Sequence, residues 1–315
     1  MNKIICGDAL EVLRTFPNES ANCVVTSPPY YCLRDYGVSG QIGLEKSPEM
    51  YIENLVSVFM ECHRILRNDG TMWVVIGDSY AGSGRGWGDK NGLYSRGVQP
   101  TASFATKFSK PHKLANYKNK DLVGVPFMLA FALRERGWYL RQDIIWHKPN
   151  PMPESVRDRC TKAHEYIFLF SKQPKYYFDH AAMREPANYD RRKKIIKGAS
   201  KKYTAGSTLM PLQSIAKGGG CRWREFDGQF IRNKRDVWRV PTRAFKEAHF
   251  ATFPPDLIRP CIEAGCPQNG VVLDCFMGAG TTAVVARELG RNFVGVELNR
   301  EYVAIARERL KVTQP

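Results

Sequence analysis

Five consecutive residues near the N-terminus, Thr26-Ser27-Pro28-Pro29-Tyr30, place a hydroxyl group, two prolines and an aromatic ring at the end of an apolar segment. Consecutive prolines fix the backbone and remove two N–H donors, which leaves carbonyl oxygens as acceptors. The exocyclic amine of a base is conjugated and therefore a weak nucleophile. A hydroxyl and a rigid carbonyl that accept its two hydrogens would shift electron density onto the nitrogen, while Tyr30 offers a face to the ring. The segment predicts chemistry on such an amine, with a plain Pro-Pro turn as the structural alternative.

A second candidate site lies near the C-terminus, in a strand–turn–helix–strand pattern. The first strand ends in Asp274, the turn contains Gly278 and Gly280, and the second strand ends in Glu297. Glycines let the backbone approach a ligand closely, and an acidic residue at the second strand's end can bind both ribose hydroxyls. Ala283 replaces the third glycine of the dinucleotide pattern, and S-adenosylmethionine has no pyrophosphate to place at a helix N-terminus. The unit therefore favours S-adenosylmethionine over NAD.

The net charge of +16 is concentrated in two segments. Residues 184–246 contain 17 basic and 5 acidic residues, and residues 81–120 contain 8 and 1, which leaves about −3 for the remainder. Both segments are rich in Gly, Ser, Asn and aromatic residues, and neither shows helical or strand periodicity. We interpret them as a surface that neutralises the DNA backbone, with solvated basic loops as the alternative. The candidate DNA contacts are Arg191, Arg192, Lys193, Lys194, Arg222, Trp223, Arg224 and Trp238.

Elsewhere, apolar segments of strand length alternate with amphipathic segments of helix length. The expected strands are residues 22–26, 71–76, 138–146, 165–171, 271–274 and 292–297. The expected helices are residues 8–16, 47–66, 123–136, 281–289 and 299–310. Asn68-Asp69-Gly70 is expected to stop the second helix. The alternation predicts an α/β fold with a doubly wound, mostly parallel sheet, in which the carboxyl ends of the strands meet at one crevice.

In this order, the two motifs resemble those of the DNA amino-methyltransferases. Members with the permuted beta-type arrangement carry [DNS]-P-P-[YFW] first, a target-recognition region next and the cofactor half last. Here TSPPY spans 26–30 and DCFMGAG spans 274–280. The resemblance implies a Rossmann-like methyltransferase fold with an inserted basic DNA-recognition region. Its expected parts are a catalytic half at 1–183 that includes the basic loop 81–120, a recognition insert at 184–246 and a cofactor half at 247–315.

The resemblance also implies S-adenosyl-L-methionine as cofactor and assigns roles to residues. Glu297 would bind the ribose, Asp8 would lie near the adenine amine, and Thr281 and Thr282 near the methionine end. The expected cofactor residues are Asp8, Phe253, Pro254, Asp274, Phe276, Gly278, Gly280, Thr281, Thr282 and Glu297, and the expected catalytic residues are Ser27, Pro28, Pro29 and Tyr30. Residues 142–151 resemble the strand and loop beside the flipped base, where Trp146 is either a base neighbour or a core aromatic. His147 and His164 are interpreted as structural.

The expected reaction is direct methyl transfer to the exocyclic amine of a base flipped out of a duplex. In this family, Ser before the two prolines is associated mainly with cytosine-N4 and Asp with adenine-N6. Ser27 therefore favours cytosine-N4, with adenine-N6 as the alternative. Alternatives from other classes are a methyltransferase for RNA or protein amides and a DNA-binding module with an inactive site.

The remaining expectations concern partners and location. Double-stranded DNA is the expected partner, a cognate restriction endonuclease is a further candidate, and both monomer and homodimer stay open. The nine cysteines form no CxxC pair and no zinc spacing, so no metal is expected. Because the chain lacks an apolar run of about 18 residues and begins without a signal-peptide pattern, we expect a cytoplasmic protein that is not in the membrane.

Overall fold

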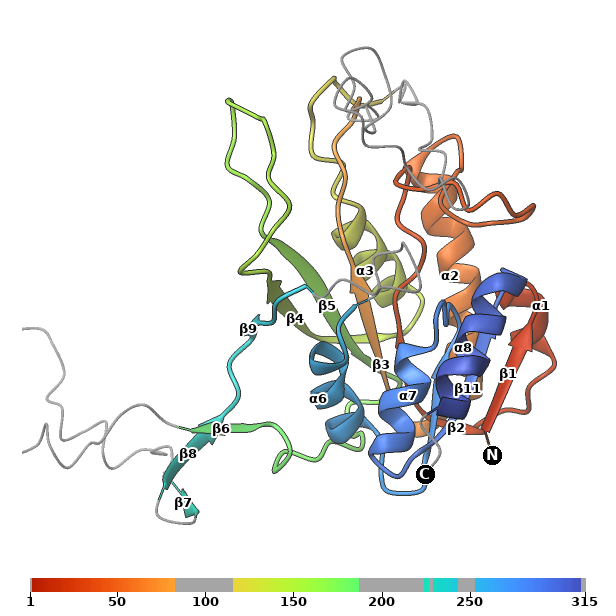
Figure 1. Cartoon of the computed structure of the whole chain (residues 1–315), viewed down its shortest axis with the longest axis vertical. Coiled ribbons are helices and arrows are strands. Elements are labelled where there is room, and N and C mark those ends of the chain that lie inside the picture. Colours follow the sequence, from red (N-terminus) through yellow and green to blue (C-terminus); the bar gives the residue numbers. More distant parts are fainter. Residues whose placement is uncertain (1, 83–115, 187–223, 227–228, 243–252, 313–315) are drawn as a thin grey trace, which may run out of the picture. The chain divides into compact units, whose positions relative to one another are not determined.

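The computed structural model describes residues 2–82, 116–186, 224–226, 229–242 and 253–312 (Figure 1). They fall into two compact units. The first combines Met1–Asp179 with Asp236–Pro315, and the second is His180–Arg235. The first unit contains both motifs singled out above.

An eight-stranded sheet forms the centre of the first unit. Its strands are β1 (Asn2–Cys6), β2 (Ala21–Thr26), β3 (Leu66–Ile76), β4 (Tyr139–His147), β5 (His164–Ser171), β9 (Val237–Arg239), β10 (Val271–Asp274) and β11 (Asn292–Glu297). They lie in the order β1-β11-β10-β2-β3-β5-β4-β9. β5 is antiparallel to both of its neighbours, and the other neighbouring pairs are parallel. The predicted mostly parallel sheet is confirmed.

Helices cover both faces of this sheet (Figure 1). On one face lie α1 (Ala9–Arg14), α2 (Pro48–Ile65) and α3 (Val125–Glu135); on the other lie α6 (Pro255–Gly265), α7 (Thr281–Glu288) and α8 (Arg300–Val312). The central strands therefore have apolar residues on both sides. Val24 and Met72 join the core under α1, α2 and α3, whereas the alternating Cys23 and Trp73 face Gly265 of α6.

Helix α2 shows how local signals set the boundaries. Ser47 caps its first turn by accepting a hydrogen bond from the Met50 N–H, and Pro48 occupies the first position. The helix ends at Ile65, before the Asn-Asp-Gly stop that the sequence predicts, because Leu66 is already extended and fully buried at the start of β3. The predicted stop is therefore wrong, and those three residues lie within the strand.

Five short strands were not expected. The apolar core of β1 is two adjacent isoleucines, and two neighbouring residues cannot show the alternation of apolar and polar residues that identifies a strand. In the second unit, β6 (Arg184–Pro186), β8 (Gln229–Asn233) and β7 (Arg224–Phe226) form a three-stranded antiparallel sheet, in which Glu185 pairs with Arg232 and Arg235. β9 lies at the edge of the main sheet. The sequence of 184–246 shows no strand periodicity because strands of three to five residues give no detectable alternation. Among the described residues, no helix is long and apolar enough to cross a membrane.

The close approach of α6 to the sheet gives a test of the packing. A Cβ atom at Gly265 would lie 2.5 Å from Thr71 Oγ1 and 2.7 Å from Trp73 Nε1. Although alanine usually favours a helix, Gly265→Ala should lower the free energy of unfolding by about 1–3 kcal/mol through overpacking. Urea unfolding of the two proteins measures this, and a more stable variant would contradict the packing described.

Candidate active site

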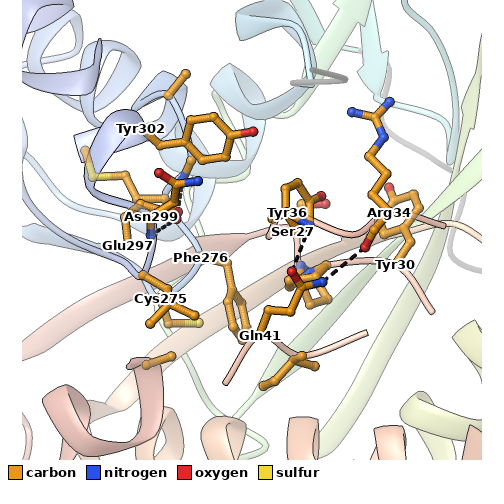
Figure 2. Close-up of a pocket in the computed structure, with 18 of the residues that line it drawn as sticks. Ser27, Tyr30, Arg34, Tyr36, Gln41, Cys275, Phe276, Glu297, Asn299 and Tyr302 are labelled. Atoms are coloured by element: carbon orange, nitrogen blue, oxygen red, sulfur yellow. Dashed lines mark hydrogen bonds between the residues drawn. The ribbon is translucent and has the colours of Figure 1, made fainter. Parts of the chain in front are cut away.

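A cavity of about 260 Å³ opens at the edge of the main sheet where the parallel strands end. Both motifs line it, although they are separated by almost the whole chain. Figure 2 shows Ser27 and Tyr30 across the cavity from Phe276 and Glu297. Ser27–Tyr30 follow β2, Phe276 follows β10, and Glu297 ends β11, so the sheet topology brings the two motifs together.

Asp274 joins the two halves beneath the cavity. Its carboxylate accepts hydrogen bonds from the hydroxyls of Thr26 (2.7 Å) and Thr282 (2.6 Å) and from the N–H of Phe276 (3.1 Å). The side chain is buried, and this burial raises the pKa of Asp274 to about 6 despite the three donors. Asp274 and Thr282 therefore lie below the cavity wall and bond to each other rather than lining it.

The C-terminal side of the cavity is built on a tight turn. Gly278 has φ +52°, and its N–H donates to Glu297 Oε2 at 2.8 Å. The other oxygen of Glu297 accepts from the Asn299 N–H at 2.8 Å, and burial raises the pKa of this carboxyl group. Gly280 has φ +83° and does not line the cavity, because it packs against Ala306 of α8.

Of the other residues predicted to bind a cofactor, some line the cavity and one lies outside its wall. Asp8 lines the cavity while it caps α1 by accepting from the Glu11 N–H at 3.0 Å. Phe253 and Thr281 also line it. Pro254 is buried and precedes the first turn of α6, outside the cavity wall. The acidic groups of the lining thus include Asp8, at the start of α1, and Glu297, at the end of β11.

The N-terminal side is held by buried polar contacts. The carbonyl of Pro29 accepts a hydrogen bond from the Tyr51 hydroxyl at 2.7 Å. Tyr30 donates from its hydroxyl to Glu165 Oε2 at 2.7 Å, and burial together with the Glu165 charge raises the pKa of Tyr30. Lys148 pairs with the other oxygen of Glu165. A Cβ atom at residue 77 would lie 2.7 Å from the Tyr30 ring, so Gly77 leaves room for it.

Trp146 combines the two roles that the sequence leaves open. It is 4% exposed, and its ring N–H donates to the Val240 carbonyl at 2.8 Å, as in a core aromatic. It also lines the cavity, and the Lys148 ammonium lies 4.3 Å from the centre of its ring. Of the two histidines, His164 contacts the Tyr166 hydroxyl at 3.3 Å, and burial lowers its pKa.

A loop that sequence reasoning missed closes part of the cavity. Arg34, Tyr36 and Gln41 line it, and the Gln41 amide accepts from the Tyr36 N–H and donates to the Arg34 carbonyl (Figure 2). The Tyr36 ring packs edge-on against Tyr302 of α8. Glu165, Lys148 and Tyr302 also went unpredicted, since a partner from a distant strand leaves no local signal.

The predicted DNA contacts lie mostly beyond the described residues. Those outside are Arg191, Arg192, Lys193, Lys194, Arg222 and Trp223. Arg224 begins β7. Trp238 is 4% exposed in β9, so the prediction that it is available to a base is wrong: the ring packs into the edge of the main sheet. Within the described part of the chain, no cluster of three His, Cys, Asp or Glu residues could hold a metal ion.

Comparisons with known sequences show close relatives along almost the whole chain. A family model for N6/N4 methyltransferases, described as DNA methylase, matches residues 21–308. The Type II methyltransferase M.XycI of Xanthomonas campestris pv. cyanopsidis is 44% identical over 308 residues, which are 97% of this chain and 86% of that protein. M.Cfr9I of Citrobacter freundii is 45% identical over 307 residues, with 97% and 86% covered. M.SmaI of Serratia marcescens is 44% identical, with 98% and 90% covered.

Solved structures share the fold. A putative DNA modification methylase of Thermus thermophilus, solved in complex with S-adenosyl-L-methionine, aligns with a TM-score of 0.59 at 24% identity over 99% of this chain and 94% of that one. The cytosine-N4-specific PvuII DNA methyltransferase aligns with a TM-score of 0.63 at 18% identity over 98% and 86%. Both alignments extend over the main sheet and its helices.

The buried carboxylate of Asp274 gives a test by pH. Its pKa in the folded chain is raised above the unfolded value of 3.8, so the folded state binds the proton more tightly and stability falls as the pH rises from about 4 to about 6. Asp274→Asn keeps one acceptor oxygen, replaces the other with an NH2 donor that the Thr282 hydroxyl can accept from, and does not titrate. The stability of the native chain minus that of the variant should therefore drop by up to about 3 kcal/mol between pH 4 and pH 7.

Urea unfolding of both proteins across this pH range measures the difference, and effects of titrating groups that do not interact with Asp274 cancel in the comparison. A difference that stays constant with pH would mean that Asp274 has an ordinary pKa.

Proposed function

The chain belongs to the DNA methylase family of N6/N4 methyltransferases, and on that premise we propose that its target is the N4 amine of a cytosine in double-stranded DNA. The observation that carries the proposal is that Ser27 and Pro28 line the same cavity as Glu297 and Phe276. Ser before the two prolines favours cytosine. The PvuII enzyme, a structural neighbour, is cytosine-N4-specific. Adenine-N6 is the second candidate, because the family model includes both kinds of enzyme.

The cofactor is S-adenosyl-L-methionine, which supplies an electrophilic methyl group on a sulfonium. The cavity fits it: Asp8 and Glu297 are acceptors that suit an amine and ribose hydroxyls, and their negative charges disfavour a pyrophosphate. In our proposal Glu297 binds the ribose, Asp8 lies at the adenine amine, Phe276 lies against the adenosine and Thr281 is near the methionine end.

We propose a supporting role for four of the residues expected to touch the cofactor. They lie outside the cavity lining, where each fixes an element that does line it; they are Pro254, Asp274, Gly280 and Thr282. Asp274 sets the start of the turn after β10, and Gly280 lets α7 approach α8. Changing them would displace the wall of the site rather than remove a contact.

On the other side of the cavity, Ser27 and the backbone bind the amine. The Pro29 carbonyl is already bonded by Tyr51, so the Pro28 carbonyl is the backbone acceptor that we assign to one amine hydrogen. The Ser27 hydroxyl accepts the other. These two bonds would orient the nitrogen lone pair toward the methyl group, and alignment supplies most of the rate of an in-line displacement. The bond from sulfur to the methyl group would break as the nitrogen–carbon bond forms, the sulfonium would leave as a neutral thioether, and the methylated amine would lose one proton to water. Tyr30, held by Glu165, provides a face for the base.

The basic segments 81–120 and 184–246 are the proposed DNA contacts. Their charge would be placed against phosphates, so binding should weaken steeply with salt. Recognition by the insert would involve Arg191, Arg192, Lys193, Lys194, Arg222, Trp223 and Arg224. Since M.XycI and M.Cfr9I are Type II methyltransferases, we propose a restriction-modification role with a cognate endonuclease.

Product analysis tests the proposed function. The protein is incubated with labelled S-adenosyl-L-methionine and unmethylated DNA, and the DNA is digested to nucleosides. We expect the label in N4-methylcytosine. Label in N6-methyladenine would replace the proposed base while keeping the chemistry. Cofactor binding with no label in DNA would overturn the choice of substrate and direct the search to RNA or protein.

Substitution of the catalytic hydroxyl tests its role. Ser27→Ala should leave cofactor affinity unchanged and reduce turnover by about a hundredfold or more, since one positioned hydrogen-bonding partner of the reacting group is lost. Ser57→Ala, which removes an exposed hydroxyl that bonds only within α2, is the matched control. Turnover by the Ser27 variant equal to that of the control would remove Ser27 from the mechanism.

A further inference from the structure

We infer that Met152 is a wedge that enters the DNA base stack as the target nucleotide leaves it; this inference rests on the proposed function. Among the large hydrophobic side chains that the structure describes, Met152 is the most exposed, at 79%. Exposure of an apolar methionine side chain to water does not stabilise the protein. Proteins that distort DNA insert Met, Leu or Pro between base pairs, and the net charge of +16 suits a DNA partner.

The loop that carries Met152 is fixed at its base. Lys148 donates from its backbone N–H to the Ala163 carbonyl at 2.8 Å, which closes the connection between β4 and β5. The Asn150 side chain then forms two bonds with the backbone of Thr242: it accepts from the N–H at 2.9 Å and donates to the carbonyl at 3.1 Å. Pro151 and Pro153 on either side of Met152 restrict the backbone of the tip.

The returning side of the loop is braced as well. Glu154 accepts hydrogen bonds from Arg159 (2.6 Å) and from the Lys162 N–H (3.3 Å). Lys162 donates to the Asp78 carbonyl at 3.0 Å, and the Arg159 guanidinium lies over the Tyr80 ring. Met152 is therefore presented by an ordered loop, so little entropy is lost when it meets a partner.

The loop is rooted at the mouth of the active site. Lys148 and Thr242 both line the cavity. Met152 is two residues beyond Asn150, so its backbone is within about 7 Å of this anchor. Figure 1 shows the β4–β5 connection projecting beyond the ends of its two strands. The loop therefore lies beside one side of the cavity.

DNA is the partner that the surroundings of Met152 favour. Arg157, on the same loop, is exposed and can meet a phosphate beside the inserted side chain. The prolines remove N–H donors from the tip, so the loop is a poor edge for strand pairing with another protein. A flexible, polarizable methionine fits the gap that a flipped base leaves between its neighbours.

The test separates the cost of flipping from the rest of the reaction. Once the methylated position is mapped on plasmid DNA, duplexes are made with the target base paired or mismatched. Met152→Ala should slow methylation of the paired duplex by about tenfold, and the mismatch should reduce the defect to about twofold or less, because an unpaired base leaves the stack at lower cost. Met152→Leu should retain most of the activity.

Two further measurements complete the test. With 2-aminopurine at the target position, the fluorescence increase on flipping should be smaller for Met152→Ala, while cofactor affinity stays unchanged. Tyr139→Ala is the control: Tyr139 is 43% exposed at the opposite end of β4 and should behave as the native chain. An equal defect on both duplexes, or none, would overturn the wedge. Native protein that methylates no DNA would instead mean that the proposed function has failed.

Discussion

Asp274 accepts hydrogen bonds from Thr26 and Thr282 in the buried centre of the molecule, and this contact joins the two parts of the chain that supply the site. Thr26 is the last residue of β2 and precedes Ser27; Asp274 is the last residue of β10 and precedes the turn with Gly278. Segments 248 residues apart are thus bonded immediately before the residues that they position: Thr26 is one residue from Ser27, and Asp274 is two residues from Phe276. Burial disfavours the charged carboxylate, and three donors partly offset that cost. The two walls of the cavity consequently share one buried support.

The direction of a single strand determines which side chains line the cavity beside Ser27 and Tyr30. Parallel strands bring only their carboxyl ends to the crevice, but β5 runs the other way and brings its first residues there. Glu165 at the start of β5 can therefore bind the Tyr30 hydroxyl and pair with Lys148 from the end of β4. The aromatic face of the site is fixed by a carboxylate that no local motif contains. The loop with Met152 connects the same two strands, β4 and β5, so these strands position both the site and its rim.

Sequence patterns predicted what is local and missed what depends on distant partners. The Ser27 motif and the turn at Gly278 were found because each lies within one short segment. The buried strands and the helices other than α6 followed from periodicity. Three features had no such signal. The sequence around Asp274 does not reveal its hydrogen bond to Thr26, which lies on a distant strand. Trp238 looks available to a base until β9 pairs with β4 and buries it. Glu165 has no recognisable role in the sequence, because only the antiparallel direction of β5 places it at the cavity.

The central claim is that one cavity presents a methyl donor from the C-terminal half to an amine held by the N-terminal half. A crystal structure of the chain with a non-reactive analogue of S-adenosyl-L-methionine measures this directly. The claim predicts that the analogue's ribose lies at Glu297 and its adenine near Asp8. The group that takes the place of the sulfonium methyl should point across the cavity at Ser27. An analogue bound with that end directed away from Ser27, or bound outside the cavity, would contradict it.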